Sequence, residues 1–393
     1  MQATQEDDVT TVTADELREI RRAVRELCSR YPDTYWRELE PDGYPEQFVA
    51  ELTESGWLAA LIPEEYGGAG LSLTAASVIL EEINRSGGNS AACHAQMYTM
   101  ATILRHGSEE QKQRYLPKIA SGELRLQAFG VTEATAGSDT TSIQTTATRV
   151  DGGYVVRGQK IWTSRAEHSD LMLLLARTTP RNEVEKKTDG LSTFLVDMKA
   201  AGDALKIVPI KTMMNHATTE VFFDGVELPQ DALIGEEGKG FRYILDGMNA
   251  ERVLIAAECI GDGRWFIDRA VRYAGERSVF GRPIGANQGI QFPLARAYAA
   301  IEAADLMRFK AAQLFDEGCT IGPEANMAKL LASEASWEAA NACLDTHGGF
   351  GFAAEYDVER KFRETRLYRV APISNNLILA YLGQHVLGMP RSY

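Results

Sequence analysis

The stretch Phe129-Gly130-Val131-Thr132-Glu133-Ala134-Thr135-Ala136-Gly137-Ser138-Asp139 lies where two kinds of sequence pattern meet. It has the form of a strand that ends in a turn of small residues, with N–H groups and hydroxyls left as hydrogen-bond donors. A turn of this kind can hold phosphates or the polar edge of a ring. A plain connecting loop has the same composition, so the stretch taken alone leaves both interpretations open.

Around and after this stretch, from about residue 125 to 232, the sequence has the pattern of short strands. The segments TSIQTTATRV and GYVVRG flank Asp151-Gly152, a dipeptide typical of a tight hairpin turn. Three more strand-like segments follow, DLMLLLART, LSTFLVD and TEVFFDGVELP, separated by polar or Gly/Pro turns. The polar run from Arg181 to Asp189 is expected to be a solvated loop. This part predicts a small β-barrel or sandwich domain.

On both sides of the β part, apolar residues recur at three- and four-residue steps. Leu17, Ile20, Val24 and Leu27 follow this helical period, and Ser108 to Gln111 has the form of a capping box. The period returns after about residue 235, over spans long enough for a helical bundle. The chain is therefore predicted to be α+β, with an N-terminal helical domain at 1–124, a middle β domain at 125–232 and a C-terminal four-helix bundle at 233–393.

The composition limits the class of protein. The 393 residues carry a formal net charge of -14, which opposes non-specific binding to nucleic acid or to an anionic membrane. The five cysteines are odd in number and scattered, without a C-x-x-C pair, so we expect a reducing compartment. The six histidines show no metal-ligand spacing, and no metal is expected.

The N-terminal sequence MQATQEDDVTTV is acidic and polar. It lacks the layout of a secretory signal and that of an Arg-rich transit peptide. No apolar run approaches the roughly 18 residues that a membrane span needs. We therefore expect a cytoplasmic protein without membrane association.

Four segments, taken together, resemble the acyl-CoA dehydrogenase family. The stretch at 129–139 is similar to the flavin-binding signature V-T-E-P-x-A-G-S-D, with Ala134 where proline is usual. Three more segments follow in the family's order, at Gly158–Ser164, at Glu276–Arg282 with Gln288, and at His347–Phe352. The resemblance implies the family's helix–β–helix fold along nearly the whole chain, and FAD as the cofactor.

The resemblance also implies which residues hold the flavin ring. Phe129, Val131 and Thr132 would line the isoalloxazine, and Ser138 would reach the cofactor diphosphate or the bound thioester ligand. An aromatic face suits a π system, and a donor suits the place where a hydride arrives. Trp162 would accordingly pack against the flavin, with the Ser164 hydroxyl near N5. Without the neighbouring motifs, Trp162 would be interpreted as a core-filling aromatic residue.

Other matching positions imply an oligomer. Arg277 and Gln288 resemble residues that hold the FAD of a neighbouring subunit, so the active sites would need an oligomer, commonly a tetramer. Taken alone, these two residues would be interpreted as a surface salt bridge on a helix, which is worth little. The remaining cofactor contacts expected from the matching segments are Phe280, Gly348, Gly349 and Ser374.

The position of the catalytic base departs from the commonest family pattern. Acyl-CoA oxidation needs a carboxylate that faces the substrate α-carbon with little water around it. Many members carry this glutamate in a Tyr-Glu-Gly-Thr run, but the matching place holds Pro372. A minority, including isovaleryl-CoA dehydrogenase, carry it on an earlier helix before an arginine, which here is Glu251-Arg252. Glu251 is thus the expected base, and the alternative is a first-turn glutamate favoured by the helix dipole.

Substrate contacts are expected around this base and at the first motif. Arg252 would help to keep Glu251 ionised. The substrate-binding residues expected are Ser138, Asn249 and Arg252. His216, near a place often held by arginine, is expected to be a structural or rim residue rather than a catalyst.

Proline at position 372 also removes a hydrogen-bond donor. In family members the backbone N–H at that position helps to hold the thioester carbonyl, and proline has no N–H. Loss of one oxyanion donor costs about 3 kcal/mol. Either another donor replaces it, such as the Ile373 N–H or Ser374, or the chemistry differs.

The resemblance predicts FAD-dependent α,β-dehydrogenation of a short, branched or medium-chain acyl-CoA, with electrons passed to an electron-transfer flavoprotein. One alternative keeps the fold and FAD but alters the reaction, as in related flavin monooxygenases and a desulfinase that acts on a sulfinated acyl-CoA. Another is a non-catalytic or nucleic-acid-associated relative, which the acidic charge balance and Glu251 both oppose.

Overall fold

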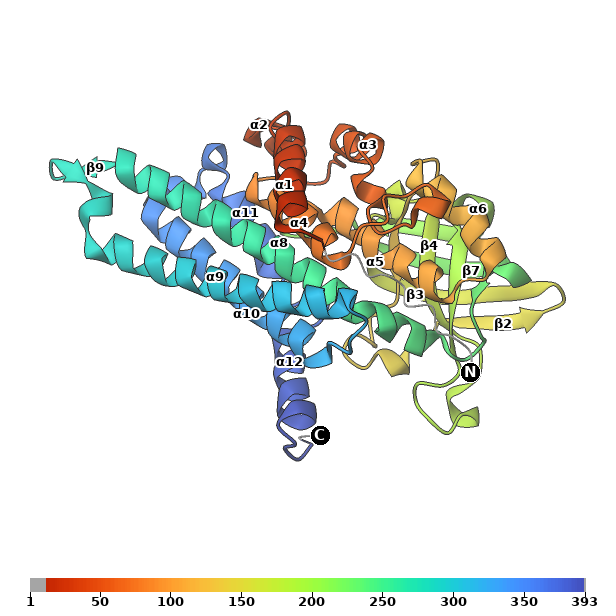
Figure 1. Ribbon diagram of the computed structural model, residues 1–393. Helices are drawn as coiled ribbons and strands as arrows, with labels where there is room; N and C mark the ends of the chain where they lie inside the picture. The colour runs from red at the N-terminus through yellow and green to blue at the C-terminus, as the bar shows by residue number, and fades with distance from the viewer. Residues whose placement is uncertain (1–11, 392–393) are drawn as a thin grey trace. The chain divides into compact units, whose positions relative to one another are not determined.

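The computed structural model describes residues 12–391 (Figure 1). Residues 1–11, for which no targeting signal is predicted, lie outside the described part. The described chain forms two compact units. The "β unit" comprises residues 31–70 and 89–251, and the "helical unit" comprises residues 12–30, 71–88 and 252–391.

The β unit is built on one eight-stranded sheet. Its strand order is β6-β7-β3-β2-β4-β5-β8, and β1 pairs with β4 in parallel. The hairpin predicted at Asp151-Gly152 is confirmed, since β2 and β3 pair antiparallel from Val150 and Gly153 outward. The strands are β1(Leu126–Gly130), β2(Thr146–Val150), β3(Gly153–Ser164), β4(Leu171–Arg177), β5(Leu191–Asp197), β6(Leu205–Pro209), β7(Thr218–Pro229) and β8(Leu233–Ile234).

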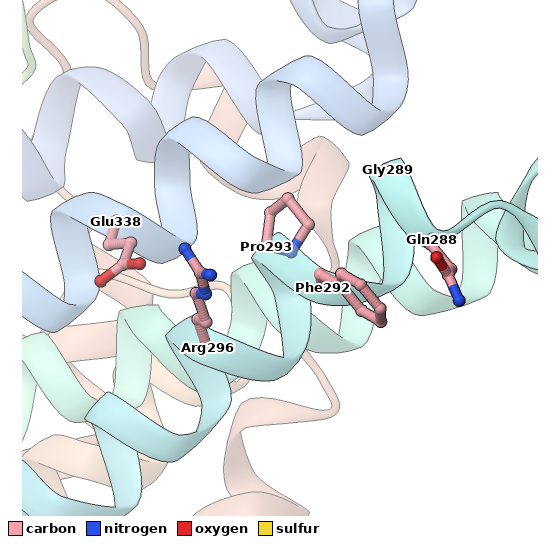
Figure 2. A pocket seen from close by; sticks show the side chains of 6 residues that line it. All are labelled: Gln288, Gly289, Phe292, Pro293, Arg296 and Glu338. Atoms are coloured by element: carbon pink, nitrogen blue, oxygen red, sulfur yellow. The ribbon is translucent and has the colours of Figure 1, made fainter.

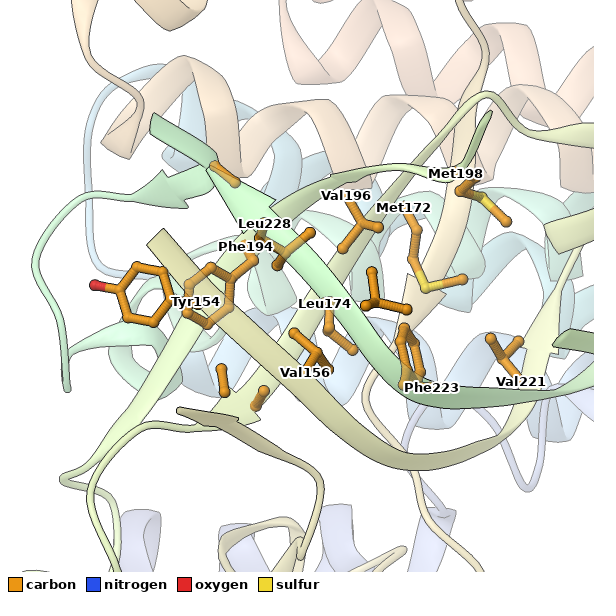
Figure 3. Packing of buried hydrophobic residues seen from close by; sticks show 14 of the residues in the cluster. Tyr154, Val156, Met172, Leu174, Phe194, Val196, Met198, Val221, Phe223 and Leu228 are labelled. Atoms are coloured by element: carbon orange, nitrogen blue, oxygen red, sulfur yellow. The ribbon is translucent and has the colours of Figure 1, made fainter. Parts of the chain in front are cut away.

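One face of this sheet closes over an apolar core. Alternate residues along each strand point inward because the side-chain period of a strand is two. Tyr154 and Phe194 meet edge to face there, with ring centroids 4.9 Å apart (Figure 3). Helices of the same unit precede the sheet, namely α2(Asp33–Glu38), α3(Glu46–Glu54), α5(Ala91–His106) and α6(Glu109–Ala120). The capping box predicted at Ser108 starts α6.

The helical unit is built around three long helices, and two of its other helices come from far upstream in the sequence. Besides the part of α8(Gly240–Glu276) that follows Glu251, it contains α9(Gln288–Asp316) and α10(Gly322–His347), which pack along each other (Figure 1). A short hairpin, β9(Ser278–Val279) and β10(Arg282–Pro283), joins α8 to α9. The remaining helices are α1(Ala14–Cys28), α4(Leu73–Arg85), α11(Val358–Leu367) and α12(Asn375–Tyr381).

Buried ion pairs and close helix packing attach α1 and α4 to the C-terminal helices of the same unit. Glu81 of α4 accepts hydrogen bonds from Arg21 of α1 at 2.7 Å and from Arg308 of α9 at 2.8 Å. Burial opposes ionisation of Glu81, yet the surrounding arginines lower its pKa to about 2. Gly261 of α8 lies so close to α4 that a Cβ there would be 2.3 Å from the Glu81 carbonyl oxygen. The predicted α+β class and the helix–β–helix order of the chain are confirmed.

Candidate functional site

The turn at 129–139 is held in shape by a buried ion pair. The Glu133 carboxylate accepts the Gln144 N–H at 2.6 Å and the Thr145 N–H at 2.9 Å. It also accepts the Lys160 ammonium at 2.8 Å, and the same ammonium donates to the Val131 carbonyl at 3.0 Å. Burial opposes ionisation of Glu133, but Lys160 and the N–H donors hold its pKa below the ordinary value. The Glu133 carboxylate, itself part of the turn, therefore fixes the shape of the turn by its hydrogen bonds.

This ion pair brings the first two sequence motifs together. Besides the bond from Lys160 to Val131, the Ile161 N–H donates to the Thr132 carbonyl at 2.9 Å. Lys160 stands inside the second motif, yet sequence reasoning did not single it out. Its position in that motif was the available signal, but its partner Glu133 lies 27 residues away.

Trp162 is presented to the surface by an unusual backbone. Its φ is 61°, in the left-handed region that a bulky residue rarely adopts. The register of β3 against β7 shifts between Lys160 and Thr163, so Trp162 occupies an irregularity in the strand. The side chain is 57% exposed. Interpretation of Trp162 as a core-filling residue is therefore wrong, and strain at an exposed aromatic residue is typical of a binding site.

The other predicted cofactor residues of the β unit have accessible groups. Ser138 is exposed, and Phe129, Thr132 and Ser164 are half-buried. At Gly137, an added Cβ would meet no atom within 4 Å, so the turn has open space beside it. An open aromatic face, hydroxyl donors and a turn with free space fit the ring and polar edge of a flavin.

A polar cluster that sequence reasoning did not assemble lies in the same unit. The Arg165 guanidinium is 3.3 Å from His216 Nδ1. Burial, together with the charges of Arg165 and His94, holds the pKa of His216 well below the ordinary value. His94 itself contacts Tyr98, whose ring meets Phe129 edge to face at 5.6 Å.

In the helical unit, the third and fourth motifs meet. The Arg277 guanidinium lies 5.8 Å from the centroid of the Phe350 ring, within reach of a cation–π contact. Phe280, at the tip of the β9–β10 hairpin, is fully exposed with φ 52°. Gly348 ends α10 with φ 57°, and an added Cβ at Gly348 or Gly349 would meet no atom within 4 Å. An exposed cation beside open glycines suits a phosphate-bearing group.

Gln288, the first residue of α9, lines a shallow pocket of about 400 Å³ (Figure 2). Phe292 and Pro293 give this pocket an apolar floor, and Arg296 and Glu338 place opposite charges at one end of it (Figure 2). Phe292 is exposed although it is a large apolar residue. The predicted cofactor residue Gln288 is thus part of an open, partly apolar surface of the helical unit.

Glu251 lies inside a long helix. Helix α8 begins at Gly240, so the alternative interpretation of Glu251 as a first-turn glutamate is wrong. Glu251 is 6% exposed, and the residues from 253 to 257 are all apolar and buried, with Val253 and Leu254 both at 0%. Arg252 is also buried, whereas Asn249 is half-buried. A carboxylate in such surroundings is costly to desolvate, which is typical of a functional acid.

Pro372 and Ser374 belong to a short turn between α11 and α12. The Ser374 hydroxyl accepts the Leu377 N–H at 3.4 Å and so caps α12. A hydroxyl that accepts this bond can still donate its own hydrogen. The turn at Ala371–Asn375 is closed by a backbone hydrogen bond, in which the Asn375 N–H donates to the Arg369 carbonyl at 3.2 Å.

The structure describes the side chains of residues 12–391. No group of three or more His, Cys, Asp or Glu side chains in that range could hold a metal ion. None of the helices described is both long and apolar enough to cross a bilayer. All five cysteines are free thiols, and Cys319 is the exposed one.

Three family descriptions match consecutive parts of the chain, in the helix–β–helix order described above. The family descriptions "Acyl-CoA dehydrogenase, N-terminal domain", "middle domain" and "C-terminal domain" match residues 14–123, 128–226 and 238–385. Acyl-CoA dehydrogenase FadE12 of Mycobacterium tuberculosis is 35% identical over 392 residues, covering 98% of this chain and 100% of the relative. Cyclohex-1-ene-1-carbonyl-CoA dehydrogenase of Syntrophus aciditrophicus is 32% identical over 390 residues, covering 98% and 93% of the two chains.

A solved structure of the glutaryl-coenzyme A dehydrogenase glutaryl-CoA complex superposes with a TM-score of 0.89. It is 31% identical and covers 97% of this chain and 98% of its own. Sequence and fold thus agree over the whole length of the described molecule. The chain belongs to the acyl-CoA dehydrogenase family of FAD-dependent oxidoreductases.

Proposed function

We propose that this enzyme dehydrogenates a short, branched or medium-chain acyl-CoA thioester, with Glu251 as the base that removes the α-proton. The observation that carries the proposal is a buried carboxylate in the interior of α8 of a chain whose usual base position holds Pro372. Burial excludes water, which strengthens a base that faces a weakly acidic carbon.

The proposed FAD contacts come from two groups of predicted residues, one in each unit. In the β unit, Phe129, Val131, Thr132, Trp162 and Ser164 would hold the flavin ring, with Ser138 at its phosphates or at the thioester. In the helical unit, Arg277, Phe280, Gln288, Gly348, Gly349 and Ser374 would contact FAD. When bound, FAD accepts a hydride, the electron pair and hydrogen that leave the substrate β-carbon.

The side chains of the protein remove the α-proton of the substrate. The Glu251 carboxylate takes the α-proton, and the electron pair of the broken C–H bond forms the new double bond between the α- and β-carbons. Arg252, next to Glu251, keeps that carboxylate ionised through its charge. Asn249 and Arg252, together with Ser138, would bind the substrate.

Negative charge on the thioester carbonyl needs a donor, and Pro372 cannot supply one from its backbone. Ser374 lies two residues further, and its hydroxyl retains a hydrogen to donate while it caps α12. We place the replacement donor in this turn, at the Ile373 N–H or at Ser374.

Partners and compartment follow the family. We propose a homotetramer, because Phe280 and Phe292 expose large apolar surfaces beside Arg277 and Gln288, the residues assigned to a neighbouring subunit's FAD. An electron-transfer flavoprotein would reoxidise the enzyme. The five free thiols suit the reducing cytoplasm, and we retain the three-domain division at 1–124, 125–232 and 233–393.

Anaerobic rapid mixing with a panel of acyl-CoA thioesters tests the proposal. Flavin bleaching by a saturated short, branched or medium-chain thioester is expected. No bleaching, combined with oxygen-dependent turnover of the reduced flavin, would instead favour the monooxygenase-like alternative that the missing N–H at Pro372 leaves open. A protein without turnover of either kind would contradict both.

A further inference from the structure

A fully buried lysine lies directly beneath the turn that carries Pro372. Lys329, on α10, is 0% exposed. Its ammonium donates to the Ile373 carbonyl at 2.7 Å and to the Asn375 side-chain oxygen at 2.9 Å. Both acceptors are on the short turn between α11 and α12, 44 and 46 residues away in sequence. A bond from a charged donor is about twice as strong as a neutral one, so this contact holds the turn firmly.

The second acceptor is itself oriented by α10. The Asn375 amide donates to the Ser333 hydroxyl at 3.1 Å. Ser333 lies four residues after Lys329, on the same face of the helix. One face of α10 therefore contacts the Asn375 side chain at two points, and its amide cannot turn over without losing the bond from Lys329.

The bond to Ile373 sets the plane of a peptide group in the turn. Cis peptide bonds among the described residues occur only before Pro41 and Pro372, so the Ile373–Ser374 peptide is trans. In a trans peptide the C=O and the following N–H point in opposite directions. With the Ile373 carbonyl directed at Lys329, the Ser374 N–H points away from the Lys329 ammonium.

Lys329 also lies close to the segment of α8 that follows Glu251. Burial lowers the pKa of Lys329 to about 8, and the charges of Arg252 and Arg369 act in the same direction. Cys259 of α8 and Glu334 act in the opposite direction. The ammonium thus lies within electrostatic range of Arg252 on one side and bonds the turn of Pro372 on the other.

We propose that Lys329 is a positioning residue, which fixes the turn at Ala371–Asn375 against α10 so that the groups of this turn meet the acyl thioester. The inference rests on the proposed function for its consequence in catalysis. Its structural content, that Lys329 orders the turn, stands independently. The family motifs in the sequence do not include Lys329.

Hydrogen–deuterium exchange on the FAD-loaded, full-length protein tests the structural content. Lys329→Met removes the ammonium and keeps an unbranched apolar chain. Amide exchange over residues 370–376 should accelerate at least about tenfold, because the turn loses its charged anchor. Asn375→Leu should accelerate the same segment, whereas Asn375→Asp keeps an acceptor and should leave exchange close to that of the parent. The Asn375 pair decides the question if Lys329→Met does not fold.

Arg264→Met is the matched control. Arg264 is a largely buried cation of α8 that bonds Glu302 and Asp305 and does not contact the turn. This variant should lower the melting temperature while exchange over residues 370–376 stays unchanged. Equal exchange in the parent, Lys329→Met and Asn375→Leu would overturn the inference, as would equal acceleration in Arg264→Met.

Flavin reduction then tests the catalytic consequence. For a thioester that bleaches the parent, Lys329→Met should slow the reduction step about 10- to 100-fold, with little change in thioester affinity. Normal reduction in a variant whose turn exchanges fast would show that the order of the turn is irrelevant to chemistry, and would overturn the positioning role. If no thioester reduces the parent, the proposed function fails, while the exchange data still decide whether Lys329 orders the turn.

Discussion

Two loops that bear predicted site residues are each anchored by a buried lysine, and the two anchors differ in kind. In the β unit, Lys160 bonds a carboxylate, Glu133, and a carbonyl, Val131. In the helical unit, Lys329 bonds a carbonyl, Ile373, and an amide, Asn375. Burial lowers the pKa of each lysine to about 8.

The difference concerns what remains when the lysine is removed. Without Lys160, the buried Glu133 carboxylate loses its counter-charge, and an uncompensated buried charge is strongly destabilising. Without Lys329, only neutral acceptors are left, and neutral groups can find water or each other at lower cost. The flavin-side loop is thus tied to the stability of its unit, whereas the turn at Pro372 can change its order with little effect on the fold.

The largest effect is expected on the chemistry itself, from Glu251→Gln. The amide keeps the size of the side chain but cannot accept the α-proton, so flavin reduction should fall about 10²- to 10⁴-fold with FAD and thioester binding retained. Single-turnover reduction in stopped flow measures this. Glu258→Gln alters another buried acid of the same helix and serves as the control. Near-normal reduction in Glu251→Gln would remove Glu251 from the mechanism.

Lys160→Met sharpens the comparison on the β side. It should lower the free energy of unfolding by about 3–5 kcal/mol, because Glu133 is left buried without a counter-charge. Denaturant unfolding and FAD content of the purified protein measure the result. Adding Glu133→Gln to Lys160→Met should recover part of the loss, since the pair is then neutral. A Lys160→Met protein as stable as the parent would show that the two anchors do not differ.

Arg277→Ala tests the cofactor contacts of the helical unit. A hydrogen bond to a charged group contributes about 1.5–3 kcal/mol, so the FAD dissociation constant should rise about 10- to 100-fold. Titration of apoprotein with FAD, followed by fluorescence, measures the change. Arg282→Ala, in the hairpin strand β10 that follows Arg277, is the matched control and should bind FAD like the parent. Colourless parent protein that stays apo in excess FAD would contradict the assignment of every cofactor residue.

Pro372→Ala is expected to give the smallest effect. It restores a backbone N–H at the position where relatives carry one, and it frees a backbone angle that proline had fixed. Flavin reduction by a productive thioester should be at least as fast as in the parent, and Ser374→Ala should slow the parent. Loss of reduction in Pro372→Ala, with fold and FAD kept, would mean that the proline shapes the pocket for a different substrate pose.

Much of the molecule follows from local sequence. The hairpin at Asp151-Gly152, the helix start at Ser108 and the order of helices and strands were all predictable. Periodicity, caps and turns depend on residues within a few positions of each other. The position of Glu251 within α8 was harder to predict, because neither the start of a long helix nor its burial is marked by one motif.

The sequence by itself determined the α+β class, the family, and the residue types at the four motifs. Periodicities and motifs are patterns among residues that lie close together in the chain. Only the tertiary structure decided that Lys160 anchors the turn of Glu133, that Lys329 anchors the turn of Ile373, and that α1 and α4 join the C-terminal helices. These contacts join residues 27 to 60 or more positions apart. Such partners are chosen by the path of the folded chain and by the cost of leaving a buried charge without acceptors, which no local pattern records.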